Sequence, residues 1–105
     1  MPIDYDLLAA KMSALQGPYR DWLARDVVHY LADAQQRYHQ PDFDHERLFF
    51  HIHKLKGTGA TYGFDAISLQ AAPLHDALSD GTADLQTIHK MLGGLITACE
   101  HAIHS

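Results

Sequence analysis

The sequence predicts an all-α protein, folded as an antiparallel four-helix bundle with a short additional N-terminal helix. Apolar residues recur three and four positions apart along most of the chain, which is the period of a helix, and no long segment alternates between apolar and polar residues. Short polar breaks separate the helical segments, and short connections make successive helices antiparallel neighbours. With 105 residues, 47% of them hydrophobic, the chain can build one core, so we expect residues 1–105 to form a single domain.

The N-terminal third of the chain predicts two helices. The first is expected over residues 4–16, and Gly17 and Pro18 should end it, because proline lacks the N–H that a helix interior uses. Pro18 suits the first position of a second helix, expected over residues 18–38. The first helix has an apolar stripe of Leu8, Met12 and Leu15. The core-facing stripe of the second consists of Tyr19, Trp22, Leu23, Val27, Tyr30, Leu31 and Ala34.

The third helix is expected over residues 44–62, with Asp44 as its N-cap. Its buried stripe should consist of Leu48, Ile52, Leu55, Gly59 and Tyr62. Gly63 suits the position after this helix, because glycine adopts left-handed backbone conformations without steric cost.

The last two helices are separated by a turn at residues 80–81. The fourth helix is expected over residues 65–78, with Asp65 as its cap, and Pro73 inside it should kink or restart it. Thr82 is the expected cap of the last helix. The apolar stripe of the last helix consists of Leu85, Ile88, Leu92, Leu95, Ile96, Cys99 and Ile103.

Charge and composition narrow the classes of function. The net charge of −5, from 13 acidic and 8 basic residues, argues against nucleic acid as the main partner, because no broad basic face is available for phosphates. The single cysteine, Cys99, excludes an internal disulfide and fits a reducing compartment. No signal-peptide pattern is visible, and no apolar run approaches the roughly 20 residues of a membrane-spanning helix. We therefore expect a cytoplasmic protein without nucleic-acid or membrane partners.

The most informative segment is the run HKLKGTGATYG at residues 53–63, inside the third predicted helix. Residues three, four and seven apart share a helix face, so His53 lies on one face with Lys56, Gly57 and Ala60. A glycine in a helix interior costs roughly 1 kcal/mol relative to alanine, which suggests that the missing side chain at Gly57 has a use. An imidazole group in water is largely neutral at pH 7, and its free nitrogen lone pair is a nucleophile. The pattern therefore predicts a nucleophilic His53 that stays accessible to a large partner.

These residues resemble the signature of histidine-containing phosphotransfer (HPt) domains of bacterial and plant phosphorelays. The family pattern is a histidine, then Lys-Gly three and four positions later, then small residues and a further glycine. Here the pattern is matched by His53, Lys56, Gly57, residues 58–60 and Gly63. The helix order and the length also suit the family, so the resemblance covers the whole chain. It departs at one position, since His75 follows Leu74 where the family often has Glu or Gln.

The resemblance implies a phosphohistidine carrier rather than an enzyme. His53 would accept a phosphoryl group on its distal ring nitrogen from a receiver-domain aspartate and pass it to a second receiver. The implied partners are response-regulator receiver domains and a hybrid histidine kinase. The receiver would supply Mg²⁺, so no cofactor is expected on this chain, and we expect a monomer. The sequence contains no phosphate-binding P-loop and no set of kinase motifs, which agrees with the lack of an ATP site.

The neighbours of His53 have separate expected roles. Lys56, one turn away on the same face, should partly neutralise the charge of a phosphoryl group. Gly57 and Ala60 should leave room for a docking partner. Lys54 points about 100° away from His53 on a helix, so we expect it to touch the partner rather than the phosphate.

Two other functions stay open. An adaptor bundle could bind receiver or kinase domains without transfer, although the intact His53 argues against it. A metal-binding bundle is suggested by the nine histidines, but His51 and His53 diverge on a helix, and His101 and His104 lie at a terminus. Carboxylate-bundle metal proteins need Glu-x-x-His on two helices, and neither glutamate of this chain is followed by such a histidine. We therefore expect no metal site.

Overall fold

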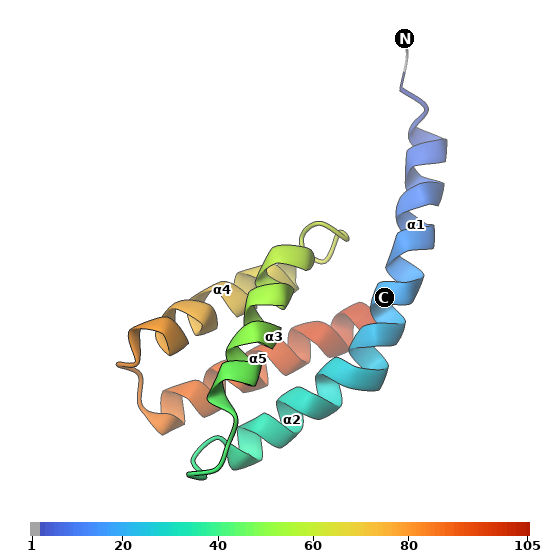
Figure 1. Cartoon of the computed structure of the whole chain (residues 1–105). Helices are drawn as coiled ribbons and strands as arrows, with labels where there is room; N and C mark the ends of the chain where they lie inside the picture. The colour runs from blue at the N-terminus through green and yellow to red at the C-terminus, as the bar shows by residue number, and fades with distance from the viewer. Residues whose placement is uncertain (1–2) are drawn as a thin grey trace.

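The computed structural model describes residues 3–105, and all regular structure in that range is helical (Figure 1). The elements are α1 (Tyr5–Trp22), the π-helical segment η1 (Leu23–Val27), α2 (Val28–Arg37), α3 (His45–Thr58), α4 (Asp65–Asp80) and α5 (Leu85–Ile103). Helix α4 packs between α3 and α5, and α5 also packs against α2. Since η1 joins α1 and α2 without a break, the chain forms a four-helix bundle, which confirms the predicted fold class.

A single apolar core, to which every helix contributes, holds the bundle together. Its buried members are Tyr19, Leu23, Val27, Leu31, Ala34, Leu48, Ile52, Leu55, Ile67, Ala71, Leu74, Ile88, Leu92, Leu95, Ala98, Cys99 and Ala102. Several residues of the predicted stripes are only half-buried at its edge, namely Trp22, Tyr30, Tyr62, Ile96 and Ile103. The assignment of Leu85 to the core was wrong, because its side chain lies at the start of α5 and is 56% exposed.

The predicted break at Gly17 and Pro18 is also wrong, because α1 runs through both residues. The carbonyl that Pro18 leaves without a helical donor belongs to Ala14, which is exposed, so water can satisfy it. The next residue, Tyr19, is buried and ties α1 to the core. The N-terminal half of α1 extends away from the other helices (Figure 1), and its apolar residues Leu8 and Leu15 are exposed.

The π-helical segment η1 keeps the first helix in register with the core. Its hydrogen bond from the Val28 N–H to the Leu23 carbonyl spans five residues, which makes a wider turn than an α-helix has. Tyr19, Leu23 and Val27 are spaced four apart, a little more than the 3.6 residues of an α-helical turn. In a regular α-helix, residues spaced four apart move gradually around the helix and away from the core. The wider π-helical turn compensates for this rotation, so that Leu23 and Val27 are both fully buried.

Helix α3 begins as predicted and ends earlier than predicted. The Asp44 side chain accepts a hydrogen bond from the Arg47 N–H at 3.0 Å, which confirms it as the N-cap. The helix ends at Thr58 instead of Tyr62, because the chain turns at residues 59–63 to enter α4. Gly63 adopts φ +87°, the left-handed conformation predicted for it.

The caps of the last two helices differ from the prediction. Phe64, not Asp65, precedes α4, and the helix runs through Pro73 to Asp80 without restarting. The carbonyl that Pro73 leaves without a donor belongs to Leu69, whose side chain is 71% exposed, so solvent again reaches this turn. Helix α5 is capped by Asp84, which accepts from the Thr87 N–H at 2.7 Å, and not by Thr82. In the described part of the chain, no helix is long and apolar enough to cross a membrane.

Candidate functional site

His53 lies in the second half of α3 with its side chain exposed. Its Nδ1 atom is 3.2 Å from Nε2 of His75 on α4, so the two rings share one hydrogen bond. No hydrogen bond joins Nε2 of His53 to any other described residue. One ring edge of His53 is therefore held by the protein, and the other edge is available to a partner.

The His75 side chain, which contacts His53, is itself fixed by packing. The His75 side chain is only 16% exposed, and its ring stacks on Phe49 of α3 with centroids 4.7 Å apart. The same Phe49 ring lies 6.5 Å from the His53 ring. Phe49 thus borders both histidines, whereas its neighbour Phe50 is 66% exposed. This stacking fixes the plane of the ring that meets Nδ1 of His53.

The predicted face beside His53 is open. Gly57 is exposed, and a Cβ added there would meet no atom within 4 Å. Ala60 is exposed in the turn that follows α3, and Lys56 is half-buried one turn from His53. Among the described residues, no ion pair or hydrogen bond engages the Lys56 ammonium group. The exposed edge of His53 therefore adjoins a small surface that carries the Lys56 ammonium group.

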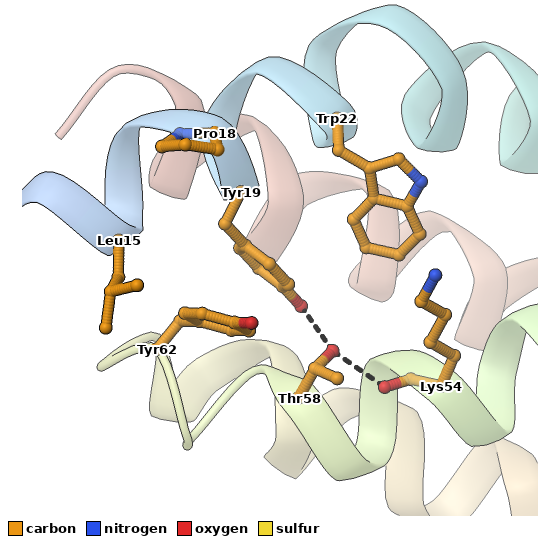
Figure 2. A pocket seen from close by; sticks show the side chains of 7 residues that line it. All are labelled: Leu15, Pro18, Tyr19, Trp22, Lys54, Thr58 and Tyr62. Carbon is orange, nitrogen blue, oxygen red and sulfur yellow. Dashed lines mark hydrogen bonds between the residues drawn. The ribbon is translucent and has the colours of Figure 1, made fainter.

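Lys54 lies on another side of α3, as the helical period predicts. Its Nζ atom is 4.6 Å from the centroid of the Trp22 ring, a cation–π contact with the first helix. Figure 2 shows Lys54 and Trp22 in the wall of a cavity of about 280 Å³ between α1 and α3. The contact turns the ammonium group of Lys54 toward α1, on a different side of α3 from His75.

Two hydrogen-bonded hydroxyl groups, those of Tyr19 and Thr58, belong to residues that line this cavity. The Thr58 hydroxyl donates to the Lys54 carbonyl at 2.7 Å, and the Tyr19 hydroxyl lies 2.8 Å from the same Thr58 oxygen (Figure 2). Because the single Thr58 proton is used on the carbonyl, Tyr19 is the donor in the second bond. Burial raises the pKa of Tyr19, so this donor keeps its proton. The network joins α1 to α3 and takes no part in the His53 surface.

His75 is the neighbour of His53 to which sequence reasoning gave no role. The one sequence signal at this position was its place after Leu74, where the resemblance to the family leads one to expect Glu or Gln. The contact joins residues 22 positions apart on two helices, and no single-helix pattern predicts such a contact.

The other histidines do not gather around His53. His51 stacks on Tyr30 with centroids 4.1 Å apart, and its Nδ1 lies 3.0 Å from the Arg47 carbonyl. His101 and His104 are exposed at the end of α5. Over residues 3–105 there is no group of three or more His, Cys, Asp or Glu side chains that could hold a metal ion.

Comparison with known proteins agrees with this geometry. A protein-family model described as "Hpt domain" matches residues 18–104, which is most of the chain and includes His53, His75 and the open face beside them. Neither the curated proteins nor the solved structures gave a match. The chain belongs to the Hpt domain family.

Proposed function

We propose that this protein accepts a phosphoryl group on Nε2 of His53 from an aspartyl phosphate of one receiver domain and passes it to another. Membership of the Hpt family places the chain among phosphohistidine carriers of two-component relays. The assignment of His53 as the acceptor rests on its exposure and its hydrogen bonding. Its Nδ1 is hydrogen-bonded to His75, whereas its Nε2 has no partner among the described residues.

The transfer step follows from this arrangement. The Nε2 lone pair attacks phosphorus in line, the N–P bond forms, and the P–O bond to the receiver aspartate breaks with its electron pair left on the carboxylate. The proton on Nδ1 of His53 stays in place during the step, since Nδ1 is not the attacking atom. Return transfer to a second receiver reverses these bond changes, so one surface serves both directions.

The residues around His53 would assist in different ways. Lys56 brings a positive charge within one helical turn, and a charge-assisted contact of this kind stabilises a phosphoryl group. Gly57 and Ala60 leave the approach to His53 clear for the receiver. Lys54 is directed toward Trp22, so any contact that it makes with a receiver would lie at the edge of the interface.

The partner would bring the remaining machinery. Receiver domains would hold Mg²⁺ and the aspartate, and a hybrid histidine kinase would supply phosphoryl groups at the start of the relay. This chain would then need no nucleotide site and would act in the cytoplasm as a monomeric carrier rather than as an enzyme.

The test is phosphoryl transfer from receiver domains of the source organism, each charged with acetyl phosphate and Mg²⁺. We expect at least one receiver to label the chain with an acid-labile, base-stable phosphate. His53→Gln should abolish labelling and leave the helical circular dichroism signal unchanged, because the side chain is exposed. Binding of receivers without labelling of the wild-type chain would instead identify an adaptor bundle.

A further inference from the structure

The proton shared by His53 and His75 decides whether Nε2 of His53 can react. At 3.2 Å between Nδ1 of His53 and Nε2 of His75, one ring donates and the other accepts. We propose that neutral His75 is a positioning residue that keeps the His53 proton on Nδ1, and that protonation of His75 withdraws the reactive lone pair and makes transfer acid-sensitive. This inference rests on the proposed role of His53 as the phosphoryl acceptor.

Two arrangements of the neutral pair are chemically distinct. In the first, the Nδ1–H of His53 donates to His75, and Nε2 of His53 has a free lone pair. In the second, the Nε2–H of His75 donates to His53, whose own proton then sits on Nε2. Only the first arrangement presents a nucleophile, so the direction of this one hydrogen bond controls the reaction.

The surroundings of His75 favour the first arrangement. In that arrangement His75 carries its proton on Nδ1, a buried atom that has no hydrogen-bond partner among the described residues in either tautomer, so its burial does not choose between the two. Oδ1 of Asp76 lies 3.7 Å from this Nδ1 atom, too far for a hydrogen bond, but its negative charge favours an N–H over a lone pair there. The stacked Phe49 ring holds the imidazole plane at this orientation.

Protonation of His75 reverses the arrangement. Both nitrogens of His75 then carry hydrogen, so its Nε2 can only donate, and Nδ1 of His53 must accept through its lone pair. The proton of neutral His53 is then on Nε2, where it blocks attack. After transfer, the phosphorylated ring keeps its Nδ1–H, which needs an acceptor, and charged His75 cannot provide one.

Among the described residues, two titratable groups contact His75. They are His53 from α3 and Asp76 from α4 itself, and at 3.7 Å the 73%-exposed Asp76 carboxylate lies well inside the screening length of salt, so its charge still acts on Nδ1. Among the described residues, no hydrogen bond or ion pair joins His75 to α5. A proton gained by either ring removes the nucleophile: on His53 it occupies Nε2 directly, and on His75 it forces the His53 proton onto Nε2. The reactivity of His53 should therefore fall with acid more steeply than that of an isolated histidine.

The matched variant is His75→Gln, because an amide oxygen accepts the same hydrogen bond at every pH and does not titrate. His75→Ala removes the acceptor altogether. The control is His51→Gln, which removes another stacked imidazole from α3, one whose contacts are Tyr30 and the Arg47 carbonyl.

The first measurement uses phosphoramidate, a reagent that phosphorylates imidazole directly and needs no partner. Peptide mass spectrometry gives the labelling rate of His53 relative to that of the exposed His29, which serves as an internal reference for the reagent. Between about pH 8 and about pH 5.5 the ratio should fall by about fivefold in the wild type and in His51→Gln, and stay constant in His75→Gln. His75→Ala should lower the ratio at about pH 8 by about fivefold, the worth of one hydrogen bond. Equal pH profiles in the wild type and His75→Gln would overturn the proposal.

The second measurement reads the tautomer without any phosphoryl transfer. In protein labelled with ¹⁵N-histidine, NMR should show the proton of neutral His53 on Nδ1 in the wild type and in His75→Gln, and increasingly on Nε2 in His75→Ala. A wild-type protein with this proton on Nε2 at about pH 8 would refute the inference, whatever the labelling assays show. Conversely, the expected tautomers together with no transfer from any charged receiver would refute the proposed function alone.

Discussion

At the scale of single residues, His53 combines exposure with a fixed ring edge. Its Nδ1 is tied to His75, and the neighbouring Gly57 adds no side chain to the surface. Lys56 supplies one cation, while Lys54, two residues earlier, is directed to the Trp22 ring. Each of these neighbours can be tested by a separate substitution.

Gly57 tests whether a receiver needs an open surface beside His53. Gly57→Leu should leave the fold intact or stabilise it by up to about 1 kcal/mol, since a Cβ there meets open space and leucine is the better helix former. The same side chain stands one turn from His53, so receiver-driven labelling should fall at least about tenfold, or ~1.4 kcal/mol in the barrier. Thermal unfolding and labelling rates are measured together. Normal transfer in a folded Gly57→Leu protein would show that access does not depend on this glycine.

Lys56 tests whether a positive charge beside His53 assists phosphoryl transfer. Lys56→Ala should slow transfer by about tenfold, the low end for a charge-assisted contact at a partly exposed site, and Lys56→Arg should retain most of the rate. Lys54→Ala is the control: it removes a cation–π contact worth about 0.5–1 kcal/mol of stability and should leave the transfer rate unchanged. A larger loss of transfer in Lys54→Ala than in Lys56→Ala would reassign the reactive face of α3.

Sequence reasoning identified candidate site residues on α3 but gave no role to His75 on α4. The period of 3.6 residues is enough to separate His53 from the buried Leu55 and from Lys54, because all three share one helix. The contact with His75 depends on how two helices pack, and packing is set by residues far from either histidine in the sequence. Here the sequence pattern could predict the face of α3 that carries His53, but not the His75 ring that contacts it.

At the scale of elements, the packing of α3 against α4 brings the two histidines together. Gly59 is buried at the end of α3, and a Cβ there would lie 2.9 Å from Ile67 Cβ and from two atoms of Ser68. The Ser68 hydroxyl also accepts a hydrogen bond from the Ala60 N–H at 2.8 Å. The missing side chain at Gly59 thus lets the two helices approach closely, and the same approach places His75 beside His53.

Two glycines of the signature should therefore respond oppositely to alanine. Gly59→Ala should destabilise the fold by about 1–3 kcal/mol, because one of the overlapping atoms is the Ser68 backbone nitrogen, which cannot swing aside. Gly57→Ala, the matched control, should be neutral or stabilising by up to about 1 kcal/mol. Urea unfolding of both variants makes the comparison, and equal stabilities would contradict the close approach of α3 and α4.

The element boundaries show where local signals fail. Asp44 was a correct cap because its side chain has the Arg47 N–H within reach. Pro18 was misread as a break, since an exposed carbonyl can be solvated without ending the helix. Asp84 outcompetes Thr82 as the cap of α5, although both residue types are good caps. The position of a helix end and the residue that caps it depend on solvent access and on the direction of the chain, which cannot be read from the sequence.

At the scale of the whole molecule, the bundle exposes the imidazole of His53 and buries the thiol of Cys99, which would be a competing nucleophile at the surface. Cys99 is fully buried, and burial followed by the nearby Glu100 carboxylate raises the pKa of its thiol to about 12. A thiol with such a pKa stays protonated at neutral pH and does not act as a nucleophile. The core thus protects Cys99, while the surface of α3 presents an imidazole.

The location of the phosphate tests the central claim most directly. The chain is labelled with a charged receiver and Mg²⁺, and ¹⁵N-histidine NMR then shows which nitrogen has bonded to phosphorus. We expect a single phosphate on Nε2 of His53, with the proton on Nδ1 still directed at His75. Phosphate on Nδ1 of His53, or on any other residue, would contradict this account.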